Sequence, residues 1–439
     1  MTAARKLFGT DGVRGVAGVD LTVDLARALG AAAVRVTGPG ATIAIGRDTR
    51  ESGPDLDEAL GEGIAAAGGN AIDLGVLPTP GVAVLARELG ADLGCVISAS
   101  HNPYRDNGIK FLGGDGRKLS DALEAGIEEA MAGPEPGGGG REPYPHAAER
   151  YVDWLVEAFG DGVDAAGELV IDCANGAASA VAPWLFEAVG VEAHAIGNAP
   201  DGRNINLGVG STHLDALAAE VASRRALGGL AFDGDADRCL GVDAGGRTVN
   251  GDAIVAVLAL DRKRRGELPG NRVVVTSMTN LGFHRLMREH DIEVEVTDVG
   301  DRYVVERMLA LGVPLGGEQS GHVVDLERHT TGDGLATSLM LLAALNRLGM
   351  TPAQAASLIV PFPQRLVAVN ADRSLLPSAD RIWQEVDAVS ENLGDRGRVV
   401  LRASGTEPVV RVMVEAEDAA ECERVCEALA DLVRAEIGV

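Results

Sequence analysis

One supersecondary pattern occurs three times along this chain of 439 residues. In each copy a short apolar strand is followed by a helix and a second strand, with glycines between them. The copies lie at residues 42–75, 169–197 and 272–300. Strands joined through a helix run parallel, because the connection crosses over one face of their sheet. The repeats therefore predict an α/β protein with three similar domains in tandem, each built on a mixed, mainly parallel sheet.

The pattern changes at two places. Residues 133–140, of sequence GPEPGGGG, are expected to form a loop or linker, since glycine and proline disfavour regular elements. Residues 398–402 and 409–415 alternate as antiparallel strands do, and a helix is expected over 419–437. The last domain is therefore predicted to be a smaller α+β domain. The expected domains are residues 1–146, 147–250, 251–363 and 364–439.

Composition excludes several classes of partner. The formal net charge of −26 argues against nucleic acids and anionic membranes. No stretch reaches the roughly 18 apolar residues that span a membrane, and the start lacks the apolar run of a signal peptide, so a cytoplasmic location is expected. The five cysteines form no C-x-x-C pair and are expected to be reduced structural thiols. An anionic metabolite can still bind where basic residues gather.

Lysine is rare in this chain, and one lysine is a candidate for proton transfer. Arginine cannot lose its proton in proteins, so a retained lysine can signal a need for titration. Lys110 lies between two apolar side chains, and such flanks can lower the pKa of an amine from about 10.4. A surface lysine with a buried stem is the alternative. The lysines are Lys6, Lys110, Lys118 and Lys263.

Residues 233–238, of sequence DGDADR, place the carboxylates of Asp233, Asp235 and Asp237 at alternate positions. Like charges so close repel one another unless a cation lies among them. In an extended backbone the three side chains would face the same way and converge. A calcium loop of the EF-hand kind would need Gly and Glu where this chain has Arg238 and Ala244. We therefore predict an incomplete Mg²⁺ site, with a solvated acidic turn as the alternative.

Three further loops carry polar groups suited to a ligand. Residues 98–103, SASHNP, follow the apolar strand expected over 93–97, and open α/β sheets present ligand sites after their strands. Residues 316–322, GGEQSGH, combine small residues with groups that bind hydroxyls. Residues 402–408, RASGTEP, and the nearby Arg411 suit a phosphate. An ordinary polar turn is the alternative for each loop.

Together these four loops resemble those of the α-D-phosphohexomutase family, in the same order and over nearly the whole chain. Residues 8–15, FGTDGVRG, and residues 46–50, GRDTR, also match the family pattern. Gln319 stands where the branches acting on mannose and glucose phosphates usually carry Met, and together with residues 300–304, GDRYV, it resembles the branch acting on glucosamine phosphates. Ser98 departs from the Thr of many members, which leaves two candidate serines in the first loop.

The resemblance implies a mutase that interconverts glucosamine 6-phosphate and glucosamine 1-phosphate for UDP-N-acetylglucosamine and cell-wall precursor synthesis. A phosphorylated Ser100 would exchange phosphate with the sugar through a bound 1,6-bisphosphate. Activity on glucose or mannose phosphates is the alternative within the family. Outside it, the alternatives are a phosphatase whose nucleophile is Asp233 or Asp235, and a non-catalytic sugar-phosphate sensor.

The resemblance also implies roles for particular residues and partners. The implied cofactors are Mg²⁺ and an activating glucosamine or glucose 1,6-bisphosphate. Sugar phosphates are the implied small-molecule partners, and a second copy of the chain and a kinase acting on Ser100 are candidate protein partners. The implied catalytic residues are Ser100, Lys110, Arg14 and His101. The implied metal ligands are Ser100, Asp233, Asp235 and Asp237. The implied substrate-binding residues are Arg238, Glu318, Ser320, His322, Arg402, Ser404, Gly405, Thr406 and Arg411.

Overall fold

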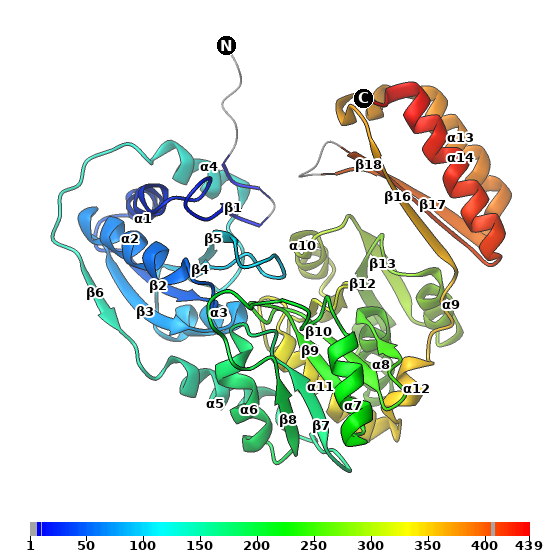
Figure 1. The fold of residues 1–439 in the computed structure, drawn as a ribbon, viewed down its shortest axis with the longest axis horizontal. Coiled ribbons are helices and arrows are strands. Elements are labelled where there is room, and N and C mark those ends of the chain that lie inside the picture. Colours follow the sequence, from blue (N-terminus) through cyan, green and yellow to red (C-terminus); the bar gives the residue numbers. More distant parts are fainter. Residues whose placement is uncertain (1–6, 10, 405–408) are drawn as a thin grey trace. The chain divides into compact units, whose positions relative to one another are not determined.

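A computed structural model describes residues 7–9, 11–404 and 409–439 (Figure 1). The chain divides into two compact units. The first unit contains residues 1–276 and 292–358, and the second contains residues 277–291 and 359–439. Among the described residues, no helix combines the length and the apolar character that crossing a membrane requires.

The first sheet of unit 1 has six strands among the described residues, in the order β1-β5-β4-β2-β3-β6. Strands β4, β2, β3 and β6 pair in parallel, and β5 and β1 run antiparallel at one side. Its strands are β1 (Val13–Val16), β2 (Thr42–Arg47), β3 (Asn70–Val76), β4 (Leu93–Ile97), β5 (Asp106–Gly113) and β6 (Gly140–Pro143), and its helices are α1 (Val23–Thr37), α2 (Gly53–Ala66), α3 (Thr79–Glu88) and α4 (Asp121–Glu129). Helices α1 and α2 pack against each other, and Leu29, Ile43 and Leu60 are fully buried in the core.

The linker prediction for residues 133–140 is wrong at its last residue. Gly140 begins strand β6, which pairs in parallel with β3 at the edge of the sheet. The reason is electrostatic, because the Arg141 guanidinium lies 3.0 Å from Asp57 and 2.8 Å from Asp73. These ion pairs hold a segment whose glycines and prolines favour no regular structure.

The second sheet has the order β11-β10-β9-β7-β8, with β9, β7 and β8 parallel and β10 antiparallel to β9. Its strands are β7 (Leu169–Asp172), β8 (Ala193–Ile196), β9 (Gly228–Phe232), β10 (Cys239–Asp243) and β11 (Thr248–Val249), and its helices are α5 (Ala147–Phe159), α6 (Ala178–Ala188) and α7 (Asp215–Arg224). The turn between β9 and β10 carries the acidic loop of residues 233–238.

The third sheet has the order β13-β12-β14-β15, with only β15 antiparallel to its neighbour. Its strands are β12 (Arg272–Thr276), β13 (Glu293–Thr297), β14 (Leu315–Gly317) and β15 (Val323–Asp325), and the nearby helices are α8 (Gly251–Arg265), η1 (Pro269–Asn271), α10 (Asp301–Leu311), α11 (Gly334–Leu348) and α12 (Pro352–Ala356). The turn from β14 to β15 carries the polar loop of residues 316–322.

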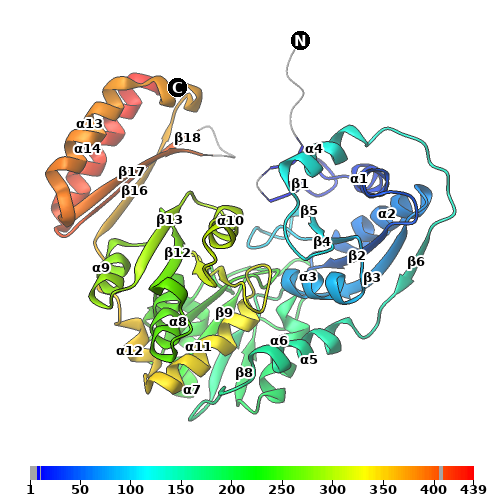
Figure 2. The ribbon, with the colours of Figure 1, turned by 180° about the vertical axis from the view of Figure 1, so that it is seen from behind.

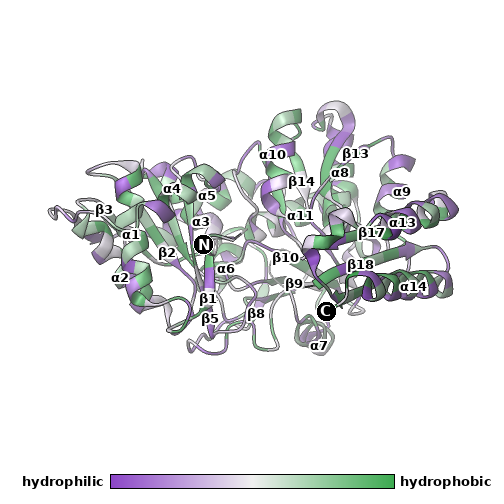
Figure 3. Cartoon of the chain, turned by 90° about the horizontal axis from the view of Figure 1, so that it is seen from above, coloured by the Kyte–Doolittle hydropathy of each residue, from purple (hydrophilic) through white to green (hydrophobic). Residues whose placement is uncertain are grey.

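Unit 2 has an antiparallel sheet of order β16-β18-β17, covered on one face by α13 and α14 (Figure 2). Its elements are α9 (Leu281–Glu289), β16 (Gln364–Asn370), η2 (Arg373–Ser378), α13 (Asp380–Leu393), η3 (Gly394–Arg396), β17 (Gly397–Ala403), β18 (Val409–Ala416) and α14 (Ala419–Ile437). Helix α14 carries both hydrophobic and hydrophilic residues along its length (Figure 3), and its Cys422 and Cys426 lie in the core. The Asn280 side chain, just before α9, donates to Glu415 of β18 at 3.0 Å.

The predicted fold class is confirmed. The three strand, helix, strand repeats form three mixed, mainly parallel sheets, and the C-terminal segment forms a smaller α+β unit. Short glycine-rich connections and buried apolar strands explain why the repeats were visible in the sequence.

Candidate active site

Ser100 lies in the loop that follows β4, and its hydroxyl reaches the acidic loop of the second sheet. Ser100 Oγ donates to Asp233 Oδ2 at 2.6 Å and lies 3.2 Å from His101 Nδ1. Its backbone has a φ of 51°, a left-handed conformation that is costly for a residue other than glycine. The buried Arg50 guanidinium holds this conformation by donating to Ser100 O at 2.8 Å. A strained serine held rigidly at a sheet end suits a nucleophile.

The hydroxyl of the other candidate serine, Ser98, forms two hydrogen bonds within the first domain. Its hydroxyl donates to Asp48 Oδ2 at 2.6 Å and accepts the backbone N–H of Ser100 at 2.9 Å. Both Ser98 and Asp48 are buried. Ser98 therefore supports the loop, while Ser100 presents its hydroxyl to the acidic side chains.

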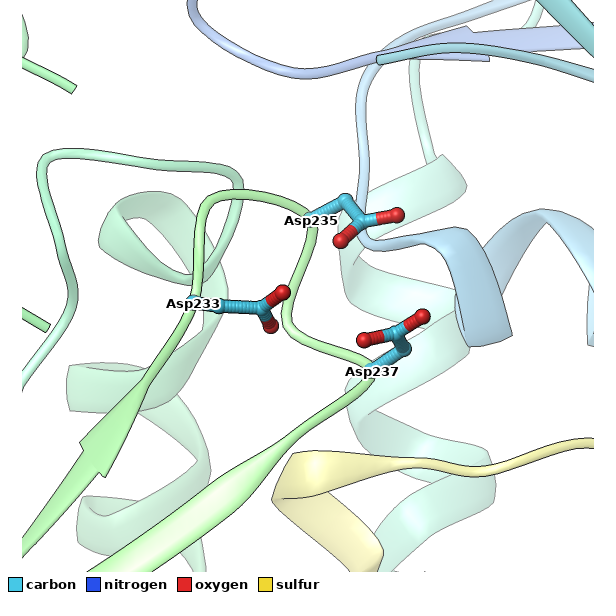
Figure 4. Close-up of side chains that lie close together, drawn as sticks. All are labelled: Asp233, Asp235 and Asp237. Atoms are coloured by element: carbon cyan, nitrogen blue, oxygen red, sulfur yellow. The ribbon is translucent and has the colours of Figure 1, made fainter. Parts of the chain in front are cut away.

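The carboxylates of Asp233, Asp235 and Asp237 converge, as predicted (Figure 4). One oxygen from each lies within 4.8 Å of the others. The backbone is a turn and not the extended segment that we expected, since Ala236 has a φ of 58°. The N–H of Gly334, at the start of α11, holds this turn by donating to Ala236 O at 2.9 Å. The side chains thus meet because the loop curls around them.

Gly234 provides the close approach between the acidic loop and the serine loop. A Cβ at this position would lie 2.4 Å from the carbonyl oxygen of Ser100. A larger residue would therefore push the two loops apart.

The three carboxylates of the acidic loop differ in the direction of their pKa shifts. Burial and the neighbouring carboxylates raise the pKa of Asp233 and of Asp237 above its usual range. Burial has the largest single effect and raises the pKa of Asp235, but Lys110, Thr79 and Arg14 together lower it by more, so that it ends well below its usual range. Asp235 Oδ2 accepts from Lys110 Nζ at 2.8 Å and from Thr79 Oγ1 at 2.5 Å.

Two oxygens of the acidic loop remain open to a ligand. Among the described residues, Asp235 Oδ1 and Asp237 Oδ1 are buried and have no hydrogen-bond partner. Buried carboxylate oxygens without a donor are costly, and a hard divalent cation satisfies them. The residues present therefore fit Mg²⁺.

The expectation of a lowered pKa for Lys110 is wrong. Burial lowers the pKa of this amine, but the carboxylates of Asp235 and Asp237 raise it by more, so the net change is upward. The flanking apolar residues suggested a hydrophobic environment. The side chain lies instead against Asp235, because alternate residues of strand β5 face opposite sides of the sheet.

Two basic side chains, Arg14 and Arg238, lie close enough to His101 of the serine loop to affect its pKa. Arg14 Nη1 donates to Ala99 O at 3.4 Å, and Arg238 Nε lies 3.8 Å from Asp237 Oδ1. Burial lowers the pKa of His101 to about 4, and the guanidiniums of Arg238 and Arg14 add to this effect. The His101 ring is therefore neutral at pH 7.

The loop at residues 316–322 carries a small hydrogen-bonded group. Ser320 Oγ donates to Glu318 Oε2 at 3.2 Å, and the backbone N–H of Gly300 donates to Glu318 Oε1 at 3.1 Å. His322 is buried, with Nε2 3.9 Å from Asp301 Oδ2. The side chain of Gln319 donates to Asp252 of α8 at 3.2 Å, so it holds the loop to that helix.

The predicted phosphate loop belongs to unit 2. Arg402 and Arg411 are directly opposite each other on β17 and β18. Burial and the charge of Arg411 lower the pKa of Arg402, which indicates two cations that an anion would stabilise. Ser404 is buried, while Gly405 and Thr406 lie outside the described residues. The other predicted site residues lie in unit 1.

Sequence reasoning assigned no role to several residues that support the site. Thr79 donates from the start of α3 to Asp235, and Asn206 Nδ2 donates to Ser100 O at 2.9 Å. Asp48 and Arg50 pair at 2.8 Å under the serine loop. Asp48 and Arg50 could have been found from the sequence, because they belong to residues 46–50, which match the family pattern. Thr79 and Asn206 had none, because their contacts span more than 100 residues of sequence.

The chain matches family models over four successive segments. They are described as phosphoglucomutase/phosphomannomutase alpha/beta/alpha domain I at residues 5–136, domain II at 149–246, domain III at 250–362 and the C-terminal domain at 366–432. The chain belongs to the phosphoglucomutase/phosphomannomutase family of α-D-phosphohexomutases. It is therefore an enzyme of the mutase class, as the four loops predicted.

Individual relatives agree with this assignment. A protein named phosphoglucosamine mutase from Rubrobacter xylanophilus is 49% identical, over 98% of each chain. A solved phosphoglucomutase/phosphomannomutase family protein from Burkholderia thailandensis is 27% identical, with a TM-score of 0.84 and coverage of 99% of this chain and 100% of that one. N-acetylphosphoglucosamine mutase from Aspergillus fumigatus, solved with GlcNAc-6P and magnesium, is 18% identical over 100% of this chain and 97% of that one, with a TM-score of 0.72, and shows a shared fold.

Proposed function

We propose that this enzyme interconverts glucosamine 6-phosphate and glucosamine 1-phosphate through a phosphoserine at Ser100 and a bound 1,6-bisphosphate. The observation that carries the proposal is the 2.6 Å hydrogen bond from Ser100 Oγ to Asp233, which brings a nucleophilic hydroxyl to an acidic loop suited to Mg²⁺. The name of the 49% identical relative supports glucosamine phosphates as the substrate. The product would serve UDP-N-acetylglucosamine and cell-wall precursor synthesis.

The return of phosphate from the sugar to the enzyme illustrates the roles of the side chains. The bond between phosphorus and the sugar oxygen breaks, and a bond between phosphorus and Ser100 Oγ forms. The Ser100 proton passes to one of the two groups in contact with it, His101 Nδ1 or Asp233 Oδ2. The sugar oxygen takes a proton from Lys110, whose raised pKa keeps it charged. The first transfer, from Ser100 to the sugar, runs in reverse.

Positioning and charge stabilisation are the main demands of phosphoryl transfer. Mg²⁺ bound by Asp233, Asp235, Asp237 and a phosphate oxygen on Ser100 would neutralise charge on the transferred group. Arg14, which donates beside Ser100 to Ala99 O, would hold the phosphoserine.

The sugar phosphate needs groups that accept it in two orientations, since each phosphate must reach Ser100 in turn. Glu318 and Ser320 would bind the sugar hydroxyls, because carboxylate and hydroxyl oxygens suit either orientation. Arg238 and His322 would lie beside the transferred phosphate. The residues proposed for the other phosphate are Arg402, Ser404, Gly405, Thr406 and Arg411.

Further proposals concern the activator, partners, location and domain limits. Glucosamine or glucose 1,6-bisphosphate would load Ser100, and a kinase is a second source of its phosphate. A homodimer is the proposed assembly. The five cysteines are free, which suits a reducing cytoplasm. Limited proteolysis tests the proposed domain limits of 1–146, 147–250, 251–363 and 364–439.

The deciding experiment compares kcat/KM for glucosamine, glucose and mannose phosphates, each with a trace of the matching bisphosphate. We expect a clear preference for glucosamine phosphate. A preference for glucose or mannose phosphate would assign the enzyme to those substrates instead. The absence of turnover on all three would reject the proposed function.

A further inference from the structure

Lys118 joins two separate parts of unit 1. Its Nζ lies 2.6 Å from Asp11 Oδ1 and 2.6 Å from Asp301 Oδ1. Asp11 lies two residues before β1, and Asp301 is the first residue of α10. A lysine ammonium is compact and has three donors, so it fits between two carboxylates where the planar guanidinium of arginine needs more room. The proposed reaction gives this lysine no role.

On one side, the Lys118 contact leads to the serine loop. Asp11 Oδ2 lies 3.5 Å from Arg14 Nη2, and the backbone O of Asp11 accepts from Arg14 Nε at 3.3 Å. Arg14 in turn donates to Ala99 O, next to Ser100. Asp11 therefore orients the guanidinium that lies beside the nucleophile.

On the other side, the contact leads to the loop of residues 316–322. Asp301 follows Gly300, whose backbone N–H donates to Glu318 Oε1. Asp301 Oδ2 also lies 3.9 Å from His322 Nε2. A displacement of Asp301 would thus move groups that contact both Glu318 and His322.

The charged Lys118 ammonium stabilises the close approach of the Asp11 and Asp301 carboxylates. Burial lowers the pKa of Lys118, but Asp301 and Asp11 raise it by more, so the amine stays charged. Asp11 raises the pKa of Asp301, which reflects repulsion between the two carboxylates. Lys118 opposes this repulsion, and the separation of the two acids depends on it.

We propose that Lys118 is a positioning residue that sets the spacing between the serine loop, residues 98–103, and the sugar loop, residues 316–322. The inference rests on the proposed mutase function. It follows from the two 2.6 Å contacts of Lys118, with Asp11 and with Asp301. Asp11 contacts Arg14 beside the serine loop, and Asp301 lies near His322 of the sugar loop. Misplacement of reacting groups by about 1 Å can cost roughly 100-fold in rate.

Other contacts near Lys118 join the same two parts of unit 1 and would remain when Lys118 is changed. The Arg302 guanidinium contacts the Asp121 carboxylate and donates to Leu119 O at 2.5 Å. Thr330 Oγ1 donates to Gly116 O at 2.9 Å. The Lys118→Met variant is therefore expected to fold with its domains in contact but with looser spacing.

The test uses the full-length variants Lys118→Met, Asp301→Asn and the double variant, with Arg117→Met as the matched control. Arg117 is adjacent and pairs with Asp115 only two residues away. Two rates are measured: kcat/KM for glucosamine 6-phosphate, and loss of phosphate from the phosphorylated enzyme to water without sugar. Intact mass reports the second rate.

We expect Lys118→Met to lower kcat/KM by about 30- to 100-fold, in line with a misplacement near 1 Å. Asp301→Asn in the same background should add less than about threefold, because neighbours that share one contact are not additive. Loss of phosphate to water should stay within twofold, since it does not need the sugar loop. Arg117→Met should change neither rate.

Three results would overturn the inference: a fall in kcat/KM below threefold, an equal change in the rate of phosphate loss to water, or independent effects in the double variant. If Lys118→Met does not fold, the isosteric Asp301→Asn variant gives the same comparison of the two rates. An inactive wild-type enzyme would instead reject the proposed function.

Discussion

Asp237→Asn is expected to affect stability in opposite directions with and without Mg²⁺. In the metal-free enzyme the charged Asp237 carboxylate is destabilising, because burial and Asp235 raise its pKa. Replacing it with a neutral amide of the same shape removes this cost. The same change removes a proposed metal ligand. The variant should therefore be more stable than wild type in EDTA and should gain less from Mg²⁺.

The magnitude follows from the geometry. Two unit charges 4.8 Å apart interact by about 3.5 kcal/mol at an effective dielectric constant near 20. His322, Lys110 and Arg238 offset part of this repulsion, since each lowers the pKa of Asp237. We expect a net gain of about 1–3 kcal/mol in EDTA. Mg²⁺ at 100 times its Kd should stabilise the wild type by about 2.7 kcal/mol.

Urea denaturation at pH 7.5, with EDTA or with Mg²⁺, measures both effects. Asp153→Asn is the control, because Asp153 is exposed on α5 and its replacement removes the same charge far from the acidic loop. Repeating the denaturation in EDTA at lower pH tests the direction of the pKa shift of Asp237. Protonation of Asp237 relieves the same repulsion, so the advantage of the variant in EDTA should shrink as the pH falls.

The reasoning would be refuted if Asp237→Asn were less stable than wild type in EDTA and still gained the full stabilisation from Mg²⁺. That result would mean that the acidic loop is satisfied by its own protein contacts.

Three further predictions concern the nucleophile, the proton donor and pH. Ser100→Ala should abolish phosphorylation of the enzyme by the bisphosphate, whereas Ser98→Ala should keep it; phosphopeptide mapping distinguishes them, and a labelled Ser98 would contradict the assignment. Lys110→Met should lower kcat by about 10²- to 10⁴-fold with little change in KM, and an unchanged kcat would remove Lys110 from the mechanism. Burial and Asp73 raise the pKa of Asp57 by more than the ion pairs with Arg141 and Arg47 lower it, to about 6, so ionisation destabilises the fold as the pH rises from about 4 to 6. Asp57→Asn should thus gain up to about 3 kcal/mol relative to wild type between pH 4 and pH 7, by urea denaturation; a pH-independent difference would refute the shift.

Much of the fold was predictable because it is encoded locally. The repeated strand, helix, strand pattern needs only apolar runs and glycines, which can be read within about 30 residues. The antiparallel strands of unit 2 were predictable from their alternation. Strand β6 was not, because it depends on ion pairs of Arg141 with Asp57 and Asp73, which are distant in sequence.

The sequence predicted which residues form the candidate site, but it did not predict their pKa shifts. Ser100 and the three aspartates stood out because their side chains carry the chemistry. The pKa of Lys110 was misjudged, since its apolar neighbours along β5 are not its neighbours in space. Thr79, at the start of α3, and Asn206 were missed for the same reason, because each is more than 100 residues from the group it contacts.

The sequence by itself determined the repeated architecture, the four functional loops and the identity of the nucleophile candidates, because these follow from local pattern and side-chain chemistry. Only the tertiary structure decided which serine faces the acidic loop, in which direction the pKa of each of the three aspartates shifts, and which acids Lys118 contacts. These depend on Coulombic and hydrogen-bond contacts a few ångströms long between residues far apart in the chain. Such distances exist only once the sheets have packed together.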